Sequence, residues 1–502
     1  MSNAFMNGLQ SASNYAYTEN GALTHRSTNS ALLDLFAMGA AYRTRSDEDV
    51  ILLFKNAFRE NPVYALKCLF YIRDVRGGQG ERRFFRVVTK WMASNEPAAM
   101  RRNLTHVAEY GRWDDLLVFL DTPLQNDALE ILRSQLALDV QCKTPSLLAK
   151  WLPSENTSSA KTRASARVVR HYLNMTAKQY RKTLSILRTR INVLEKLMSE
   201  GRWDEIEFDK IPSKAGLKYK NAFARHDVER MKRNPEVKSY EAFAKDTETK
   251  VNAEVLNPVD IANRIFGNNN PTSTDRAIFD KYWLNLKDYY HGREETGIAI
   301  CDVSGSMYGQ PLNAAVSMSA YIAERGKGPF KDHFITFSNN PRLVKFEGVD
   351  IYDKFVRASR ADWHMSTNIE ATMDMLLNTA IQNQVPAEDI PSRLYIFSDM
   401  EFNGCMTQGL VSNSHWGNRQ FVENPDTLFE SIAKKWQAYG YELPKVIFWN
   451  LNARQNNIPA LGGRFSYVSG FSMNMVETIL SGKDGYDLMM DKLDSERYKV
   501  IQ

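Results

Sequence analysis

Residues 297–306, GIAICDVSGS, are the most informative segment for the fold of the second half of the chain. It is a short apolar run that ends in a polar loop, and similar runs follow at residues 332–338, 393–399, 444–452 and 464–471. Stretches with helical periodicity separate them, namely residues 311–326, 368–382 and 426–440. Short apolar strands that alternate with helices are typical of a mostly parallel sheet covered on both faces. The sequence therefore predicts a doubly wound α/β domain here.

A D-x-S-x-S loop, with Asp302, Ser304 and Ser306, follows the first of these strands. Asp399 ends the strand RLYIFSD, and Thr367 lies between them, just before a predicted helix. Ligands of open α/β sheets bind at the carboxyl ends of the strands. A set of carboxylate and hydroxyl oxygens suits Mg²⁺ or another divalent cation. Two alternatives stay open: these side chains only cap helices and turns, or a bound metal only stabilises the domain.

These residues resemble the von Willebrand A domain and its metal-ion-dependent adhesion site (MIDAS). The resemblance implies that Ser304, Ser306 and Thr367 contact the metal directly. It also implies that Asp302 and Asp399 bind directly or through water. The family often has glycine just before the threonine, where this chain has Ser366. In many such domains a carboxylate of a partner completes the metal shell, which implies a docking site for an acidic protein.

The first half of the chain is expected to be all-α. We predict a flexible tail over residues 1–28 and the α/β domain over residues 291–502. Residues 29–290 are predicted to form HEAT-like helical repeats, because their apolar residues recur at helical spacing. The echo of GRWDD at 111–115 in GRWDE at 201–205 suggests repeats. In each copy the glycine is predicted to end a helix in the left-handed conformation, and the aspartates to cap the next one. A helix over 177–199 is expected to begin with a Thr176–Gln179 capping box.

Positive charge gathers in the first half. Residues 1–290 hold 44 Lys and Arg against 34 Asp and Glu, a net charge of +10, and the remainder holds 20 against 25, a net charge of −5. Residues 161–190 carry nine Lys and Arg and no acidic residue. Such a field attracts phosphates, although a solvated helix face is the alternative. The candidate RNA contacts are Arg163, Arg167, Arg170, His171, Lys178, Arg181, Lys182 and Arg188.

A second basic cluster, RDVRGGQGERR, spans residues 73–83. Its glycines suggest a phosphate loop, but no GK[ST] follows and the preceding segment is helical rather than strand-like. We interpret it as a helix-to-helix turn whose arginines could join a basic surface.

Several classes of protein are disfavoured. The four cysteines form no CxxC pair and the eight histidines no HxxxH or HExxH motif, which argues against zinc sites and disulfide scaffolds. No apolar run approaches the ~20 residues of a membrane span, and the first residues lack a signal pattern, so we expect a cytoplasmic protein. No Ser/His/Asp or Cys/His constellation is recognisable, so we expect no enzyme.

Helical repeats followed by such an α/β domain resemble the Ro autoantigen (TROVE) ribonucleoproteins. RDVRGGQGERR, KWLPSENTSS, MTAKQYRKTLSILR, IPSKAG and FSDMEF are similar to a related family found in plants, fungi and phages. The Ro resemblance implies a monomeric helical ring closed by the A domain, which binds structured RNA outside and single-stranded RNA ends in its hole. The expected function is a noncatalytic RNA-binding scaffold. The alternative is a protein-interaction scaffold that recruits an acidic partner through the metal.

Overall fold

The computed structural model describes residues 14–294, 296–337, 340–360, 368–404 and 426–502. The chain folds into two compact units. Unit 1 comprises Met1–Ala65, Asn257–Asn270 and Asp288–Ser495, and unit 2 comprises Leu66–Leu256, Pro271–Lys287 and Glu496–Gln502. The chain therefore passes between the units several times, and the units do not coincide with the predicted division after residue 290.

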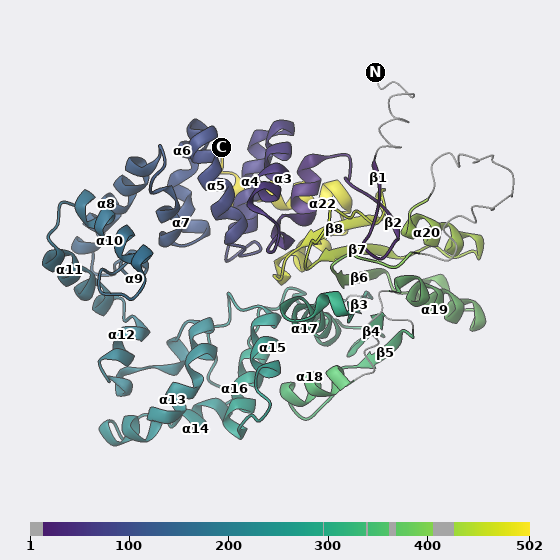
Figure 1. Cartoon of the computed structure of the whole chain (residues 1–502). Coiled ribbons are helices and arrows are strands. Elements are labelled where there is room, and N and C mark those ends of the chain that lie inside the picture. The colour runs from purple at the N-terminus through teal and green to yellow at the C-terminus, as the bar shows by residue number, and fades with distance from the viewer. Residues whose placement is uncertain (1–13, 295, 338–339, 361–367, 405–425) are drawn as a thin grey trace. The chain divides into compact units, whose positions relative to one another are not determined.

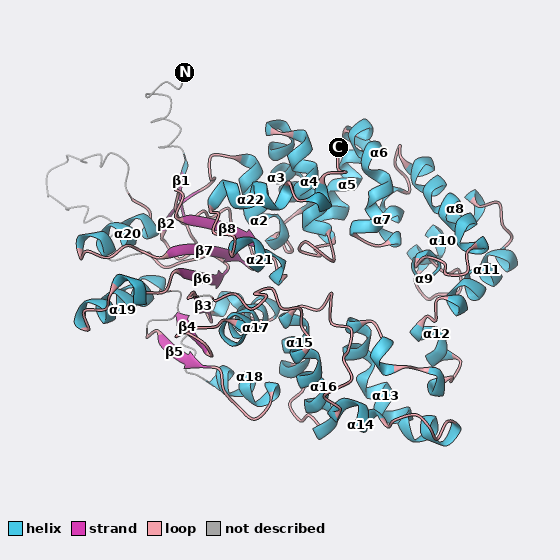
Figure 2. Ribbon diagram, turned by 180° about the vertical axis from the view of Figure 1, so that it is seen from behind, coloured by secondary structure: helices cyan, strands magenta, loops and turns pink. Residues whose placement is uncertain are grey.

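Unit 1 contains a six-stranded mixed sheet (Figures 1 and 2). The strand order is β5-β4-β3-β6-β7-β8, and every neighbouring pair is parallel except β4 and the edge strand β5. All five residues of β3 are buried, as expected for a strand covered on both faces. This confirms the α/β class. The strands are β3 (Ile298–Asp302), β4 (His333–Phe337), β5 (Arg342–Lys345), β6 (Arg393–Ser398), β7 (Lys445–Asn450) and β8 (Phe465–Ser469).

Helices cover this sheet. α17 packs against β3, β4 and β6, and α19 packs against α20. Figure 1 shows α19 and α20 on one side of the strands and α17 on the other. These helices are α17 (Gln310–Arg325), α18 (Ile351–Arg360), α19 (Ile369–Gln382), α20 (Leu428–Ala438), α21 (Val476–Ile479) and α22 (Gly485–Leu493).

Three helices predicted in the helical half belong to unit 1. α2 (Ala31–Met38) packs on β7 and β8 and also contacts α3 (Asp47–Glu60), while α15 (Pro258–Phe266) packs on α17. Seven of the eight residues of α2 are buried, because it lies against both the sheet and its neighbours. Helical periodicity in a sequence shows that one face of a helix is buried, but not which element covers that face. The sequence therefore could not show that these three helices belong to the unit that contains the sheet.

The prediction of a loose tail is wrong for residues 14–28. β1 (Tyr15–Tyr17) and β2 (Leu23–His25) form an antiparallel hairpin. The backbone N–H of His25 donates to the carbonyl of Ile458 at 2.9 Å, and the N–H of Ile458 donates back to His25 at 2.9 Å. The hairpin is thus part of the folded unit 1.

Unit 2 is helical, and its described residues contain no strand. The helices agree with the predicted all-α class, while the HEAT-like repeat stays a prediction. α4 (Pro62–Arg73) runs from unit 1 into unit 2. The others are α5 (Arg83–Asn95), α6 (Pro97–Asn103), α7 (Val107–Tyr110), α8 (Gln125–Gln141), α9 (Leu148–Trp151), α10 (Ala160–Tyr172), α11 (Ala177–Arg190), α12 (Leu194–Ser199), α13 (Ser213–Arg233), α14 (Tyr240–Lys245) and α16 (Ser273–Leu284).

The helix predicted over 177–199 is two helices, α11 and α12. Its capping box is confirmed: the Gln179 N–H donates to the Thr176 hydroxyl at 3.2 Å, and the Thr176 N–H donates to the Gln179 side chain at 2.8 Å. α11 ends early because Asn192 adopts φ 46°, the left-handed region that asparagine tolerates.

The two echoed turns differ at their glycines. Gly201 has φ 68°, as predicted, but Gly111 has φ −114°, so the left-handed prediction is wrong there. A side chain at position 111 is excluded by steric contact, because a Cβ on Gly111 would lie 2.4 Å from a carboxylate oxygen of Asp115. The capping prediction holds in this copy, where the Arg112 N–H donates to Asp115 at 3.0 Å at the start of η3 (Trp113–Phe119). In the second copy, Glu205 instead pairs with the Arg202 side chain.

The segment Glu496–Gln502 was predicted to belong to the α/β domain but folds into unit 2. The guanidinium of Arg497 and the hydroxyl of Tyr498 both donate to the buried carboxylate of Asp74, the latter at 2.9 Å. Tyr498 is fully buried and stacks on Tyr110. The hydrogen bonds to Asp74 join residues 423 and 424 positions apart, beyond the reach of a local pattern.

Candidate metal centre and basic helical surface

The carboxylate of Asp302 is fixed at the carboxyl end of β3. The backbone N–H of Ser304 donates to its Oδ1 at 2.9 Å, and the Ser398 hydroxyl, at the end of β6, donates to its Oδ2 at 2.5 Å. Asp302 is fully buried. The ends of the two adjacent parallel strands are thereby joined at one edge of the sheet, where ligands of such sheets bind.

Ser304, Ser306 and Asp399 lie beside it. The two serine hydroxyl oxygens are 3.1 Å apart, and the nearby Ser306 hydroxyl lowers the pKa of Asp399, which partly offsets the effect of burial. Oδ1 of Asp399 accepts the Glu401 N–H at 3.2 Å, whereas its buried Oδ2 has no hydrogen-bond partner among the described residues. The structure thus brings four of the five predicted metal residues together. Thr367, the fifth, lies outside the described residues.

The electrostatics of this edge fit a cation. Burial raises the pKa of Asp302, and the neighbouring Asp399 carboxylate raises it further. Burial also raises the pKa of Asp399. Two buried carboxylates repel each other, and a divalent ion between them would reverse this penalty. The described residues hold no cluster of three or more His, Cys, Asp or Glu able to bind a metal, so hydroxyl oxygens would complete this donor set.

The loop after β6 carries a strained residue. Met400 has φ 65°, a conformation that costs a non-glycine residue about 1–3 kcal/mol. Glu401 follows, and it is buried rather than at the surface. Burial raises the pKa of Glu401 to about 7, and its carboxylate accepts the Glu19 N–H and the Asn457 amide, each at 2.8 Å. The hairpin β1–β2 therefore packs against the loop that presents Asp399, a link that the sequence did not reveal.

Four predicted RNA contacts on α10 and α11 are exposed and have no ion pair within the described residues. Lys178 and Lys182 lie one turn apart on α11, so they share a face. His171 is also exposed, and its imidazole lies 3.0 Å from Arg170. The exposed cations are Arg167, Lys178, Arg181 and Lys182.

Three other predicted RNA contacts form hydrogen bonds or ion pairs within the helical unit. Arg163 donates to the carbonyls of residues 157 and 158, and Arg170 pairs with Glu155 at 2.8 Å. Arg188 donates to the carbonyls of residues 149 and 152 and to the Ser154 hydroxyl, and burial lowers its pKa. These guanidinium groups hold the segment 149–158 in place, so they contribute less to an open basic surface.

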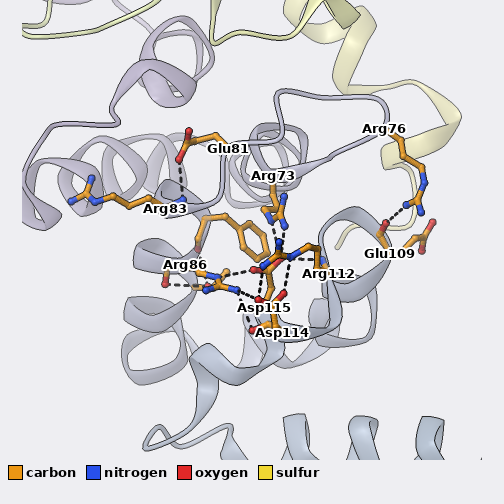
Figure 3. Close-up of polar contacts among 11 residues, drawn as sticks. Arg73, Arg76, Glu81, Arg83, Arg86, Glu109, Arg112, Asp114 and Asp115 are labelled. Carbon is orange, nitrogen blue, oxygen red and sulfur yellow. Dashed lines mark hydrogen bonds and ion pairs between the residues drawn. The ribbon is translucent and has the colours of Figure 1, made fainter. Parts of the chain in front are cut away.

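The RDVRGGQGERR segment is a turn between α4, which ends at Arg73, and α5, which begins at Arg83. This confirms the helix-to-helix interpretation. The turn is tight, since a Cβ on Gly78 would lie 1.9 Å from the carbonyl oxygen of Tyr71. Arg76, near its middle, donates to the Glu109 carbonyl at 3.0 Å (Figure 3).

A network of three arginines and two aspartates joins this turn to the GRWDD turn (Figure 3). Asp115 is fully buried and pairs with Arg73 at 2.6 Å and with Arg86 at 2.7 Å. Asp114 pairs with Arg86 at 3.0 Å and with Arg112 at 2.5 Å. Both turns stand out in the sequence, but their pairing does not, because Arg73 and Asp115 are 42 positions apart.

Among the described residues, every helix is too short or too polar to span a lipid bilayer.

Known families and proteins match nearly the whole chain. The family model described as "Domain of unknown function (DUF2828)" matches residues 18–146 and 139–283, which is more than half of the 502 residues. The chain belongs to the DUF2828 family. A second model, "Domain of unknown function (DUF7788)", matches residues 296–499 of this DUF2828 protein, the part that contains the sheet.

The DUF2828 protein is 30% identical over 509 residues to the uncharacterized protein L728 of Acanthamoeba polyphaga mimivirus. The match covers 94% of this chain and 85% of that relative. Among solved structures, the RO (RSR) protein of Deinococcus radiodurans matches at 13% identity with a TM-score of 0.42, over 94% of this chain and 100% of that one.

Proposed function

We propose that this protein is a noncatalytic RNA-binding scaffold that contacts phosphates through α10 and α11. The observation that carries the proposal is the set of exposed cations without ion pairs, Arg167, Lys178, Arg181 and Lys182, in a stretch of thirty residues without an acid. The resemblance of the motifs around them to the relatives of Ro ribonucleoproteins supports RNA as the polyanion.

Counterion release makes such binding strongly dependent on salt. Each phosphate that a cation neutralises frees condensed counterions, so the affinity falls as the salt concentration rises. For four contacts to single-stranded RNA, the slope of log K against log salt is expected to be about −3, from about −0.7 per contact.

The test is fluorescence anisotropy of a labelled oligouridylate with the full-length protein across a salt series. Binding at about 50 mM salt that weakens with a slope near −3 supports the proposal. No binding at low salt, or an affinity that does not change with salt, contradicts it.

We further propose that the sheet edge is a von Willebrand A-type metal site for Mg²⁺. Asp302, Ser304, Ser306 and Asp399 would hold the ion, with Thr367 as the fifth residue of the motif. The unpartnered Oδ2 of Asp399 and the two buried carboxylates support this assignment. The bound ion would supply a hard positive charge that attracts carboxylate oxygens.

Mg²⁺ is expected to raise the melting temperature of the protein. At a concentration of about 100 times Kd, a ligand that binds only the folded state adds about 2.7 kcal/mol, which corresponds to a shift of several degrees. Asp302→Asn should abolish this shift without lowering the melting temperature in EDTA, because it also removes the repulsion between two buried carboxylates. Differential scanning fluorimetry measures both quantities.

The matched control is Asp389→Asn, which removes an exposed carboxylate from the same unit. It should keep the full Mg²⁺ shift. A wild-type protein that melts at the same temperature in Mg²⁺ and in EDTA would refute the metal site.

A second candidate function, recruitment of an acidic protein through the metal, is favoured by one observation. Tyr308, two residues after Ser306, is 86% exposed, and tyrosine often anchors interfaces. Binding of a labelled oligoglutamate peptide should then require Mg²⁺ and weaken in Tyr308→Ala. Equal binding in EDTA would exclude this role.

A further inference from the structure

Three arginines gather where the turn before α5 meets the turn before η3. Arg82 immediately precedes α5, Arg86 lies one turn later on the same helix face, and Arg112 precedes η3. Arg82 is exposed, and the side chains of Arg86 and Arg112 are 31% and 28% exposed. All three are therefore open to a ligand from solvent.

The two aspartates below them fix the orientation of two guanidinium groups. Arg86 donates through Nε to Asp115 at 2.7 Å and through Nη2 to Asp114 at 3.0 Å. Arg112 donates through Nε and Nη2 to Asp114 (Figure 3). Each of these two guanidinium groups uses its Nε–Nη2 edge for these hydrogen bonds. Because the carboxylates already hold them, binding a ligand would cost little side-chain entropy.

The charges in this cluster do not balance. Four guanidinium groups, of Arg73, Arg82, Arg86 and Arg112, face the two carboxylates, which leaves two positive charges. Arg82 has no ion pair in the described part of the chain. Burial lowers the pKa of Arg82, and the charges of Arg86 and Arg112 lower it further. An anion is the group that would relieve this repulsion.

The start of α5 is unfavourable for cations. The first turn of this thirteen-residue helix contains no acidic residue, and its N-cap, Arg82, provides no side-chain cap. A helix N-terminus carries partial positive charge, so arginines there are destabilising unless an anion joins them. The Glu81 carboxylate already accepts the N–H of Arg83, the first residue of α5, at 2.9 Å, so the unbalanced charge of the arginine cluster, and not this terminus, points to a negatively charged ligand.

The aromatic neighbour of the cluster completes the site. The guanidinium of Arg112 lies 3.9 Å from the ring centroid of Trp151, so its plane is held by stacking. A planar guanidinium with fixed orientation binds phosphate through paired hydrogen bonds better than a mobile lysine does.

We propose that Arg82, Arg86 and Arg112 bind a phosphate group of RNA. This inference rests on the proposed RNA-binding function and adds a contact in unit 2 that is distinct from α10 and α11. Arg82 supplies the mobile charge, while Arg86 and Arg112 supply pre-oriented donors. Arg73 and Asp115 position them and do not touch the ligand.

The test compares Arg82→Gln with Arg101→Gln in two binding assays with the full chain. Arg82→Gln leaves the Arg73–Asp115–Arg86 network intact. Arg101 is an exposed residue of α6 that pairs with Asp127, so its loss is a matched loss of charge in the same unit. The assays are anisotropy with labelled oligouridylate and calorimetry with inorganic pyrophosphate.

Arg82→Gln is expected to weaken oligouridylate binding about tenfold and to reduce the magnitude of the salt slope by about 0.7. Its melting temperature should be equal to or higher than that of the wild type, because one of the mutually repelling charges is removed. Arg101→Gln should match the wild type. Equal oligouridylate affinity of the wild type and Arg82→Gln overturns the inference while the RNA function stands. If no RNA binds but Arg82→Gln abolishes pyrophosphate binding, the proposed function fails and the phosphate site stands. If neither probe binds the wild type, both fail.

Discussion

Replacing Asp115 by asparagine is expected to lower the free energy of unfolding by about 3–5 kcal/mol. The Asp115 carboxylate accepts two hydrogen bonds from the Arg73 guanidinium, one from Arg86 and one from the backbone N–H of Arg112. Arg73 is only 2% exposed, so its charge would be left buried and unpaired. Removing one partner of a buried pair costs far more than the pair itself contributes.

Urea denaturation followed by circular dichroism measures this loss. Asp127→Asn, which breaks the exposed pair with Arg101, removes the same kind of ion pair at the surface and is expected to cost about 1 kcal/mol or less. If the free energy of unfolding fell by the same small amount in both variants, the buried Arg73–Asp115 pair would not stabilise the two turns more than a surface ion pair does.

Replacing Arg167, Lys178, Arg181 and Lys182 together by glutamine is expected to lower RNA affinity at least about a hundredfold at moderate salt. Four phosphate contacts would be lost at once, and the magnitude of the salt slope should fall by about 3, from about 0.7 per contact. All four side chains are exposed and outside the core, so the melting temperature should change little. Anisotropy with labelled oligouridylate and a thermal melt measure the two effects.

The control variant removes four exposed lysines or arginines of unit 2 that already have acidic partners. It replaces Arg133, Lys210, Lys238 and Lys245 by glutamine and so changes the net charge equally. Its RNA affinity should fall only a few fold. Equal losses in the two variants would show that net charge, and not the face of α10 and α11, governs binding.

Local features were predictable from the sequence. The strands of the sheet follow from short apolar runs, and the capping box of α11 follows from Thr176 and Gln179, because both depend on neighbours a few residues away. The covering of the sheet by α2, the folding of the hairpin 14–28 and the pairing of Asp74 with Arg497 depend on distant partners. No periodicity encodes those partners.

The candidate metal and RNA sites were also predictable only where they depend on local sequence patterns. The D-x-S-x-S loop and Asp399 were found because each follows a recognisable strand, and their convergence follows from the parallel sheet. Arg163, Arg170 and Arg188 looked like surface cations in the sequence. Their acceptors are mostly backbone carbonyls, which every residue has. No sequence pattern could therefore show that these side chains already donate hydrogen bonds within the fold.

RNA binding by the exposed cations of unit 2 can be tested by ultraviolet crosslinking of the full-length protein to RNA, followed by mass spectrometry of the crosslinked peptides. We expect crosslinked peptides from residues 160–190, and from the turns around Arg82 and Arg112, that disappear at high salt. Crosslinks confined to residues 296–495, or none above a control without irradiation, would contradict it.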